Sequence, residues 1–233
     1  GFEAPKFLKV NKVRSRTAHR QINHGSKDQN LKNILDAAVA AGLTHICFTD
    51  HVDFDGSDLE PANLAARNEE IAKLAPLYPS LDISLGMELG MADADSSRLA
   101  HAYTKDIRLD FVIGSVHIVD GIDAYFPEFF AGRTREQAYG RYIERLAQTI
   151  KVSDFSIMGH YDFCTKYSPY SDRPLRHCMF PELFDDIFRF LIENGRSLEI
   201  NSSAWRTTFI IGSSFGLAPE IKQMGHFRLS MSE

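Results

Sequence analysis

The 233-residue sequence is poor in cysteine, with three residues and no C-x-x-C pair. Cys47, Cys164 and Cys178 are too few and too scattered for a disulfide framework or a zinc ribbon. No basic block accompanies the net charge of −5, so we do not expect a nucleic-acid partner. No apolar run reaches about 18 residues and no signal-peptide pattern is present, so we expect no membrane partner and a soluble, cytoplasmic protein.

The sequence does contain a regular alternation of helical and strand patterns. The expected helices are 31–43, 61–77, 95–105, 134–150, 181–194 and 219–224, and the expected strands are 45–50, 82–90, 110–117, 154–162, 197–203 and 227–232. Such alternation predicts an α/β fold with a parallel sheet, and the length suits a single domain. We assign residues 1–18 to a basic tail and 19–233 to this domain.

Polar residues stand at the C-terminal ends of nearly all the predicted strands. In a closed or nearly closed β/α barrel these ends surround one mouth, whereas in an open sheet only the strands at the switch point carry a site. The pattern therefore favours a barrel. The polar ends are Asp50 with His51, Glu88, His117, His160 with Asp162, and Glu199 with Asn201.

This collection of imidazoles and carboxylates indicates a metal centre. Burying several ionisable groups together costs several kcal/mol each, unless they are paired or coordinate a cation. Histidine and carboxylate ligands suit zinc, iron or manganese. A divalent transition metal is therefore the expected cofactor.

Several motifs, in this order and spacing, resemble those of the PHP (polymerase and histidinol phosphatase) superfamily. They are FTDH, GMELG, DFVIGSVHIVDG, GHYDF and LEINSSAWR, and together they cover residues 24 to 233. GSVHIVDG followed by YFPEFFAG, and EINSSAWR, are most similar to the histidinol-phosphate phosphatase branch. The resemblance implies a distorted (β/α)7 barrel with one to three metal ions and a small phosphorylated substrate. It also implies hydrolysis of L-histidinol phosphate to L-histidinol and phosphate, in histidine biosynthesis, by a metal-bound water.

The resemblance also assigns individual site residues. It makes Glu88 a metal-bridging carboxylate and Arg206 a contact to the substrate phosphate, where a guanidinium fork suits a phosphoryl group. The implied metal ligands are Asp28, His51, Glu88, His117 and His160.

Two family motifs are missing from this sequence. The H-x-H pair that opens the family falls on Arg20 and Ile22, although His19 and His24 lie nearby. A D-x-H pair is expected after the last strand, which is cut short in HFRLSMSE. We therefore expect an impaired catalytic centre in this chain. Two alternatives stay open: a PHP phosphoesterase of another small phosphate, and a barrel that binds without catalysis. The oligomeric state is also open.

Overall fold

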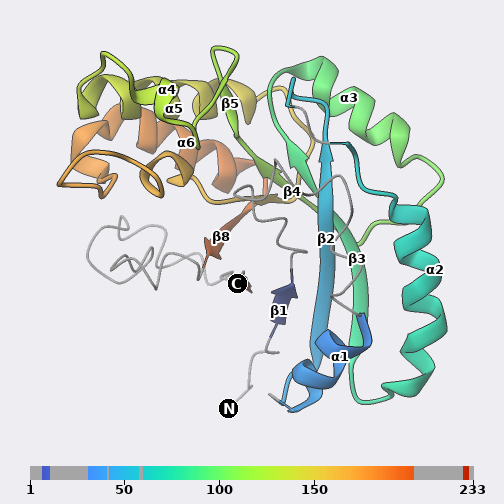
Figure 1. Ribbon diagram of the computed structural model, residues 1–233. Coiled ribbons are helices and arrows are strands. Elements are labelled where there is room, and N and C mark those ends of the chain that lie inside the picture. The colour runs from blue at the N-terminus through green and yellow to red at the C-terminus, as the bar shows by residue number, and fades with distance from the viewer. Residues whose placement is uncertain (1–6, 11–30, 41, 58–59, 202–227, 231–233) are drawn as a thin grey trace.

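The computed structural model describes residues 7–10, 31–40, 42–57, 60–201 and 228–230 (Figure 1). Its main sheet has seven strands, and all neighbouring strands in it run parallel. The α/β expectation is therefore confirmed. In spatial order, which is also chain order, the strands are β1 (Phe7–Val10), β2 (His45–Asp53), β3 (Asp82–Gly90), β4 (Phe111–Ser115), β7 (Ile157–Met158), β8 (Ser197–Asn201) and β9 (Arg228–Ser230).

Helices connect most of these strands and lie outside the curved sheet. Figure 1 shows α2 running beside β3, with α5 and α6 together on the other side of the molecule. The α-helices are α1 (Leu31–Ala40), α2 (Leu64–Leu74), α3 (Ala94–Tyr103), α4 (Pro127–Phe130), α5 (Arg135–Thr149) and α6 (Pro181–Glu193). The short 3-10 helices are η2 (Ala75–Leu77), η3 (Phe163–Thr165) and η4 (His177–Met179).

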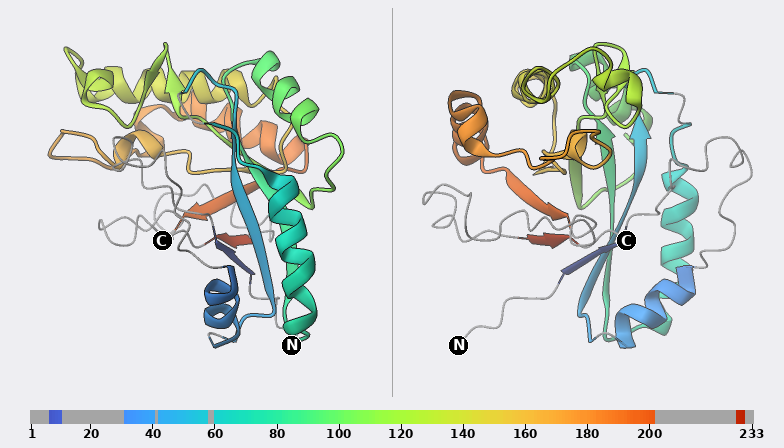
Figure 2. Two further views of the ribbon diagram at one scale, coloured as in Figure 1. Left: turned by 45° about the vertical axis from the view of Figure 1, so that its right-hand side comes forward. Right: turned by 60° about the vertical axis from the view of Figure 1, so that its left-hand side comes forward.

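The first and last strands of the sheet approach each other. β1 and β9 have Cα atoms within 8 Å of one another, and both views of Figure 2 place these two short strands side by side. Among the described residues no ladder of hydrogen bonds joins them. The strands thus curl into a nearly closed barrel, so their C-terminal ends face one common region.

The structure differs from the sequence prediction in several elements. Residues 7–10 were placed in the tail of 1–18, but they form β1 and pair with β2. β7 has only two residues, because a turn and η3 follow almost at once. The expected helix 219–224 lies outside the described residues, and the division of the chain at residue 18 stays a prediction.

An antiparallel hairpin follows β4 and was missed from the sequence. Its strands are β5 (Ile118–Val119) and β6 (Ile122–Asp123). The two residues between them, Asp120 and Gly121, have φ angles of 53° and 76°. Asp-Gly is the usual sequence for a two-residue turn that needs both φ angles positive. The hairpin therefore ends β4 early and turns the chain just after His117.

The buried apolar residues form two clusters on the outer face of the sheet. The larger cluster joins β3 and β4 to α5 and α6, with Tyr139 and Tyr142 fully buried in it. The smaller packs α1 against β2, through Leu31, Leu35 and Ile46. These two clusters fix the strands that carry the polar ends. Within the described part of the chain, no helix has the length and apolarity that crossing a membrane requires.

Candidate metal centre

β2 delivers two polar side chains to the inner face of the barrel. Because side chains alternate along a strand, His51 and Asp53 share one face while Asp50 takes the other. Asp50 accepts a hydrogen bond of 2.9 Å from the Arg67 guanidinium on α2. His51 is the neighbour of Glu88 in the sheet register, on the adjacent strand β3. The sequence grouped Asp50 with His51, but the structure turns only His51 toward the site.

Three imidazoles surround the buried Glu88 carboxylate. Its Oε1 lies 3.3 Å from His160 Nε2 and 3.7 Å from His117 Nε2, while its Oε2 lies 3.8 Å from His51 Nε2. The His117 ring centroid is 5.4 Å from that of His51 and 5.4 Å from that of His160. Four residues from β2, β3 and the loops after β4 and β7 thus present nitrogen and oxygen atoms to one small volume.

Among the described residues of the centre, solvent exposure differs between the side chains. The Glu88 and His117 side chains are each 1% exposed, whereas His51 is 23% and His160 16% exposed. The Phe163 ring stacks on His160 and meets His117 edge-on, with centroid distances of 4.9 and 5.2 Å. Within the part of the chain that the structure describes, His51 and His160 are therefore the histidines of the cluster that solvent reaches.

Ser115 at the end of β4 holds the Glu88 carboxylate in place. Its hydroxyl donates a hydrogen bond of 2.8 Å to Glu88 Oε1, and both residues are 1% exposed. Gly159, after β7, provides the room for this hydroxyl, because a Cβ there would lie 2.2 Å from Ser115 Oγ. The position of the carboxylate is therefore set by a serine and a glycine on two further segments.

Two acids lie behind the histidines. Asp53 Oδ2 lies 3.0 Å from His51 Nδ1, and Asp55 Oδ2 lies 3.8 Å from His117 Nδ1. Burial raises the pKa of Asp55, but the neighbouring His117 and the hydrogen bonds from Ser57 outweigh it and hold the pKa at about 2. Asp55 is therefore ionised over the whole neutral range.

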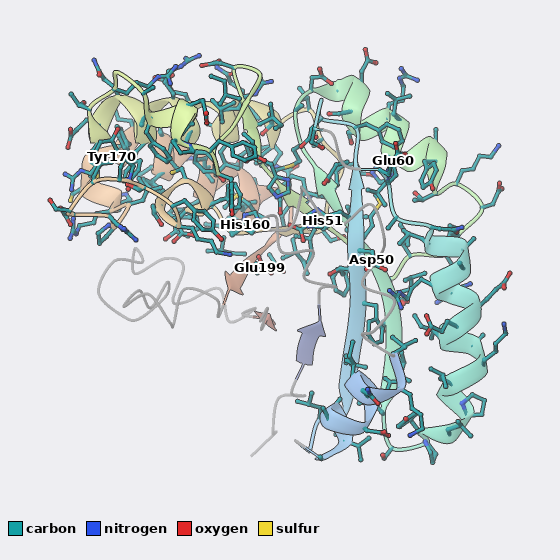
Figure 3. All side chains as sticks on the ribbon, in the orientation of Figure 1. Asp50, His51, Glu60, His160, Tyr170 and Glu199 are labelled. Carbon is teal, nitrogen blue, oxygen red and sulfur yellow. The ribbon has the colours of Figure 1, made fainter. Side chains whose placement is uncertain are left out.

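The region around His160 is fixed by β8. Glu199, 1% exposed, accepts a hydrogen bond of 3.0 Å from the His160 backbone N–H. Figure 3 shows Glu199 beside His160 and His51, with Tyr170 well away from them. Burial is the main cause that raises the pKa of nearby Asp162 to about 6. The charge of His160 lowers this pKa, and the charge of Glu199 raises it. Glu199, a strand-end acid in the sequence, thus holds the backbone that carries an imidazole.

The structure brings together four of the six residues that the sequence assigned to the site. These are His51, Glu88, His117 and His160, and the ligand atoms of the first three lie within 4.8 Å of one another. Asp28 and Arg206, like the Arg20 and Ile22 positions of the missing motif, lie outside the described residues.

Sequence reasoning missed three polar residues of the centre, namely Asp53, Asp55 and Ser115. Asp53 could have been found from the sequence, because it follows His51 by two residues and therefore lies on the same face of the strand. Ser115 carried no such signal, since its role depends on a contact with another strand.

A nearly closed α/β barrel with histidines and a glutamate at its strand ends defines a candidate metal-binding enzyme fold. The family model described as the PHP domain matches residues 18–203. The chain belongs to this family, as the motifs predicted.

Named relatives agree with this membership. The histidinol-phosphatase of Lactococcus lactis is 30% identical over 189 residues, covering 79% of this chain and 69% of the relative. The probable histidinol-phosphatase of Clostridium acetobutylicum is 21% identical over 180 residues, covering 74% and 67%. This chain thus spans about two thirds of the length of these relatives.

A solved structure shares the fold. It is the crystal structure of histidinol phosphate phosphatase from Lactococcus lactis, complexed with zinc, L-histidinol and phosphate. The TM-score is 0.76 at 23% identity, over 98% of this chain and 86% of the other. The likeness shows that the two chains share one α/β fold.

Proposed function

We propose that this protein is a metal-dependent phosphomonoesterase that hydrolyses L-histidinol phosphate to L-histidinol and phosphate. The observation that carries the proposal is the Glu88 carboxylate enclosed by His51, His117 and His160. The choice of substrate is supported by the membership of this chain in the PHP family and by its 30% identity to a histidinol-phosphatase. The reaction would serve histidine biosynthesis, and the cytoplasmic location stays a prediction.

The residues present fit a divalent transition metal. Around a tetrahedral zinc ion with ligand distances of about 2.0–2.2 Å, neighbouring ligand atoms are about 3.4 Å apart. The nitrogen–oxygen distances around Glu88 run from 3.3 to 3.8 Å, and imidazole with carboxylate is a donor set that zinc, iron and manganese accept. We propose His51, Glu88, His117 and His160 as ligands, with Asp28 as the further ligand that the sequence implies.

The two oxygens of Glu88 face different histidines. Oε1 faces His117 and His160, and Oε2 faces His51. Glu88 would therefore hold a divalent metal together with His51 through one oxygen and with His117 and His160 through the other. A bound metal ion would offset the negative charge of a phosphate group and lower the pKa of a water molecule.

The protein's own residues do the positioning and the shielding. Ser115 and the histidines keep Glu88 in one orientation without reorganisation during the reaction. The apolar Phe163 ring packs against both His117 and His160, and apolar surroundings of this kind strengthen electrostatic interactions within the centre. The phosphate group would enter past the partly exposed His51 and His160, and Arg206 is the proposed contact to it.

The test combines metal analysis with a phosphatase assay on the purified chain. We expect at least one equivalent of zinc or manganese. We expect slow release of phosphate from L-histidinol phosphate, because the H-x-H and D-x-H pairs are missing from this sequence. Changing a residue that only supports a metal ligand lowers metal affinity by roughly 10–100-fold. We expect His160→Ala to lower it by more, because this change removes a ligand itself.

The matched control is His101→Ala on α3. His101 contacts the carbonyl of Asp154 rather than the centre, so this variant should keep metal and activity. Equal metal content in His160→Ala and the unmodified chain would refute the ligand assignment. If another small phosphate monoester were hydrolysed faster than L-histidinol phosphate, that compound would be the better substrate assignment. Metal binding without turnover of either would support a non-catalytic binding protein.

A further inference from the structure

Asp53 and Asp55 are buried beside the proposed metal centre, although neither is one of its proposed ligands. Asp53 is the last residue of β2 and Asp55 follows two residues later. Their side chains have no exposed surface, although each carries a carboxylate. Burying a carboxylate costs several kcal/mol unless a partner compensates it, so both acids need a role that involves their neighbours.

We propose that Asp53 and Asp55 are positioning residues that fix His51 and His117 with Nδ1 toward a carboxylate and Nε2 toward Glu88. The inference rests on the proposed metal centre. Each histidine has one ring nitrogen near an acid, at 3.0 Å for His51 and 3.8 Å for His117. In each ring the other nitrogen faces Glu88, at 3.8 and 3.7 Å.

The chemistry follows from the hydrogen-bonding groups. A carboxylate oxygen accepts hydrogen bonds, so the 3.0 Å contact between Asp53 Oδ2 and His51 Nδ1 favours the tautomer with the ring proton on Nδ1. Nε2 is then the nitrogen that offers a lone pair to a metal ion. A carboxylate behind a histidine ligand fixes this tautomer and makes the ring a stronger donor. The longer distance from Asp55 to His117 implies a weaker hold on that ring.

The fold reserves space for these two carboxylates. Gly90 is the sheet neighbour of Asp53, just as Glu88 is the neighbour of His51. A Cβ on Gly90 would lie 2.6 Å from Asp55 Oδ2 and 2.7 Å from Asp53 Oδ1. Any side chain at this position would therefore displace the acids from the histidines.

The same atoms could form a cation site of their own, because ligand atoms of Asp53, Asp55 and His117 lie within 4.8 Å of one another. The contacts that these residues already make are the basis for the positioning role. The Oδ2 atom of Asp53 already hydrogen-bonds to His51, and Nε2 of His117 already faces Glu88. Only a cation bound through Oδ2 of Asp53 would break its hydrogen bond to His51, so the number of ions bound decides between the two roles.

The experiment measures cobalt(II) affinity of the full chain by visible absorption in competition with a chelator. We expect affinity to fall about 10–100-fold in Asp53→Ala and less in Asp55→Ala. Asp53→Asn should retain part of the affinity, because its amide oxygen still accepts from His51. Gly90→Ala should reproduce the loss with both acids present.

His117→Ala serves as the reference for loss of a ligand, and Asp50→Asn as the control. Asp50 lies on the same strand but binds Arg67, so its variant should lose stability without losing cobalt affinity or changing the absorption bands. Circular dichroism checks folding, and the isosteric asparagine variants keep the test valid if Gly90→Ala does not fold.

Three results would overturn the inference. Affinity within about twofold of the unmodified chain in both alanine variants would show that the acids position nothing that binds metal. Loss of one whole equivalent of cobalt, with the remainder bound as before, would make the acids ligands. If the unmodified chain and His117→Ala bind cobalt equally, the metal centre itself is wrong, which distinguishes that failure from the failure of the positioning role.

Discussion

Replacing Gly159 by alanine tests whether Ser115 sets the orientation of Glu88. The new Cβ would lie 2.2 Å from Ser115 Oγ, far inside contact distance, and 3.1 Å from the Ile113 side chain. The hydroxyl is the part that can move, by rotation about χ1. It would then leave the Glu88 carboxylate, to which it now donates at 2.8 Å.

The expected cost follows from that single hydrogen bond. A hydrogen bond to a charged group contributes about 1.5–3 kcal/mol, so Gly159→Ala and Ser115→Ala should each destabilise the protein by about 2 kcal/mol. Because both changes remove the same interaction, the double variant should cost little more than either single one. The coupling in a double-mutant cycle should therefore be about 1.5 kcal/mol or more.

Urea unfolding of the chelator-treated chain, followed by circular dichroism, gives the four free energies of the cycle. Thermal unfolding should agree, since about 1 kcal/mol corresponds to about 2–4 °C at this chain length. Additivity of Gly159→Ala and Ser115→Ala within about 0.5 kcal/mol would refute the reasoning. It would mean that the serine stays on Glu88 and that the glycine matters for another reason.

Two further predictions concern stability. The buried Tyr142 hydroxyl donates hydrogen bonds to the carbonyls of Val116 and His160, so Tyr142→Phe should cost about 1–2 kcal/mol in urea unfolding; no change would show that these carbonyls find other partners. Asp172 has its pKa lowered from 3.8 to about 2, chiefly by Arg176. Because this stabilisation exists above the ordinary pKa and is lost toward the lowered one, Asp172→Asn should reduce the melting temperature slightly at pH 7, with the difference shrinking below about pH 4. A difference that grows in acid would contradict this sign.

Much of the fold could be predicted from local sequence patterns. The alternation of helical and strand periods depends on which face of each segment is buried, so it gave the α/β class and most of the elements. The polar residues His51, Glu88 and His117 were visible because each stands out near the C-terminal end of an apolar run. The hairpin after β4 was recoverable in principle from its Asp-Gly turn, since this turn chemistry is local.

Only the tertiary structure decided which polar groups meet. His51 lies beside Glu88 and Asp53 beside Gly90 because two strands 37 residues apart pair in one register. No local pattern in the sequence determines that pairing. Strand alternation places Asp50 on the opposite face from His51, but its contact with Arg67 on α2 depends on how the helix packs.

The contacts around Glu88 are the clearest example of this limit. The packing of Ser115 against Gly159 has no signature in sequence, because it depends on the spacing between separate strands. Periodicity predicted the α/β class, and the acids and histidines at successive strand ends favoured a barrel over an open sheet. The distances that turn those residues into a centre come from long-range pairing, which is a property of the folded chain alone.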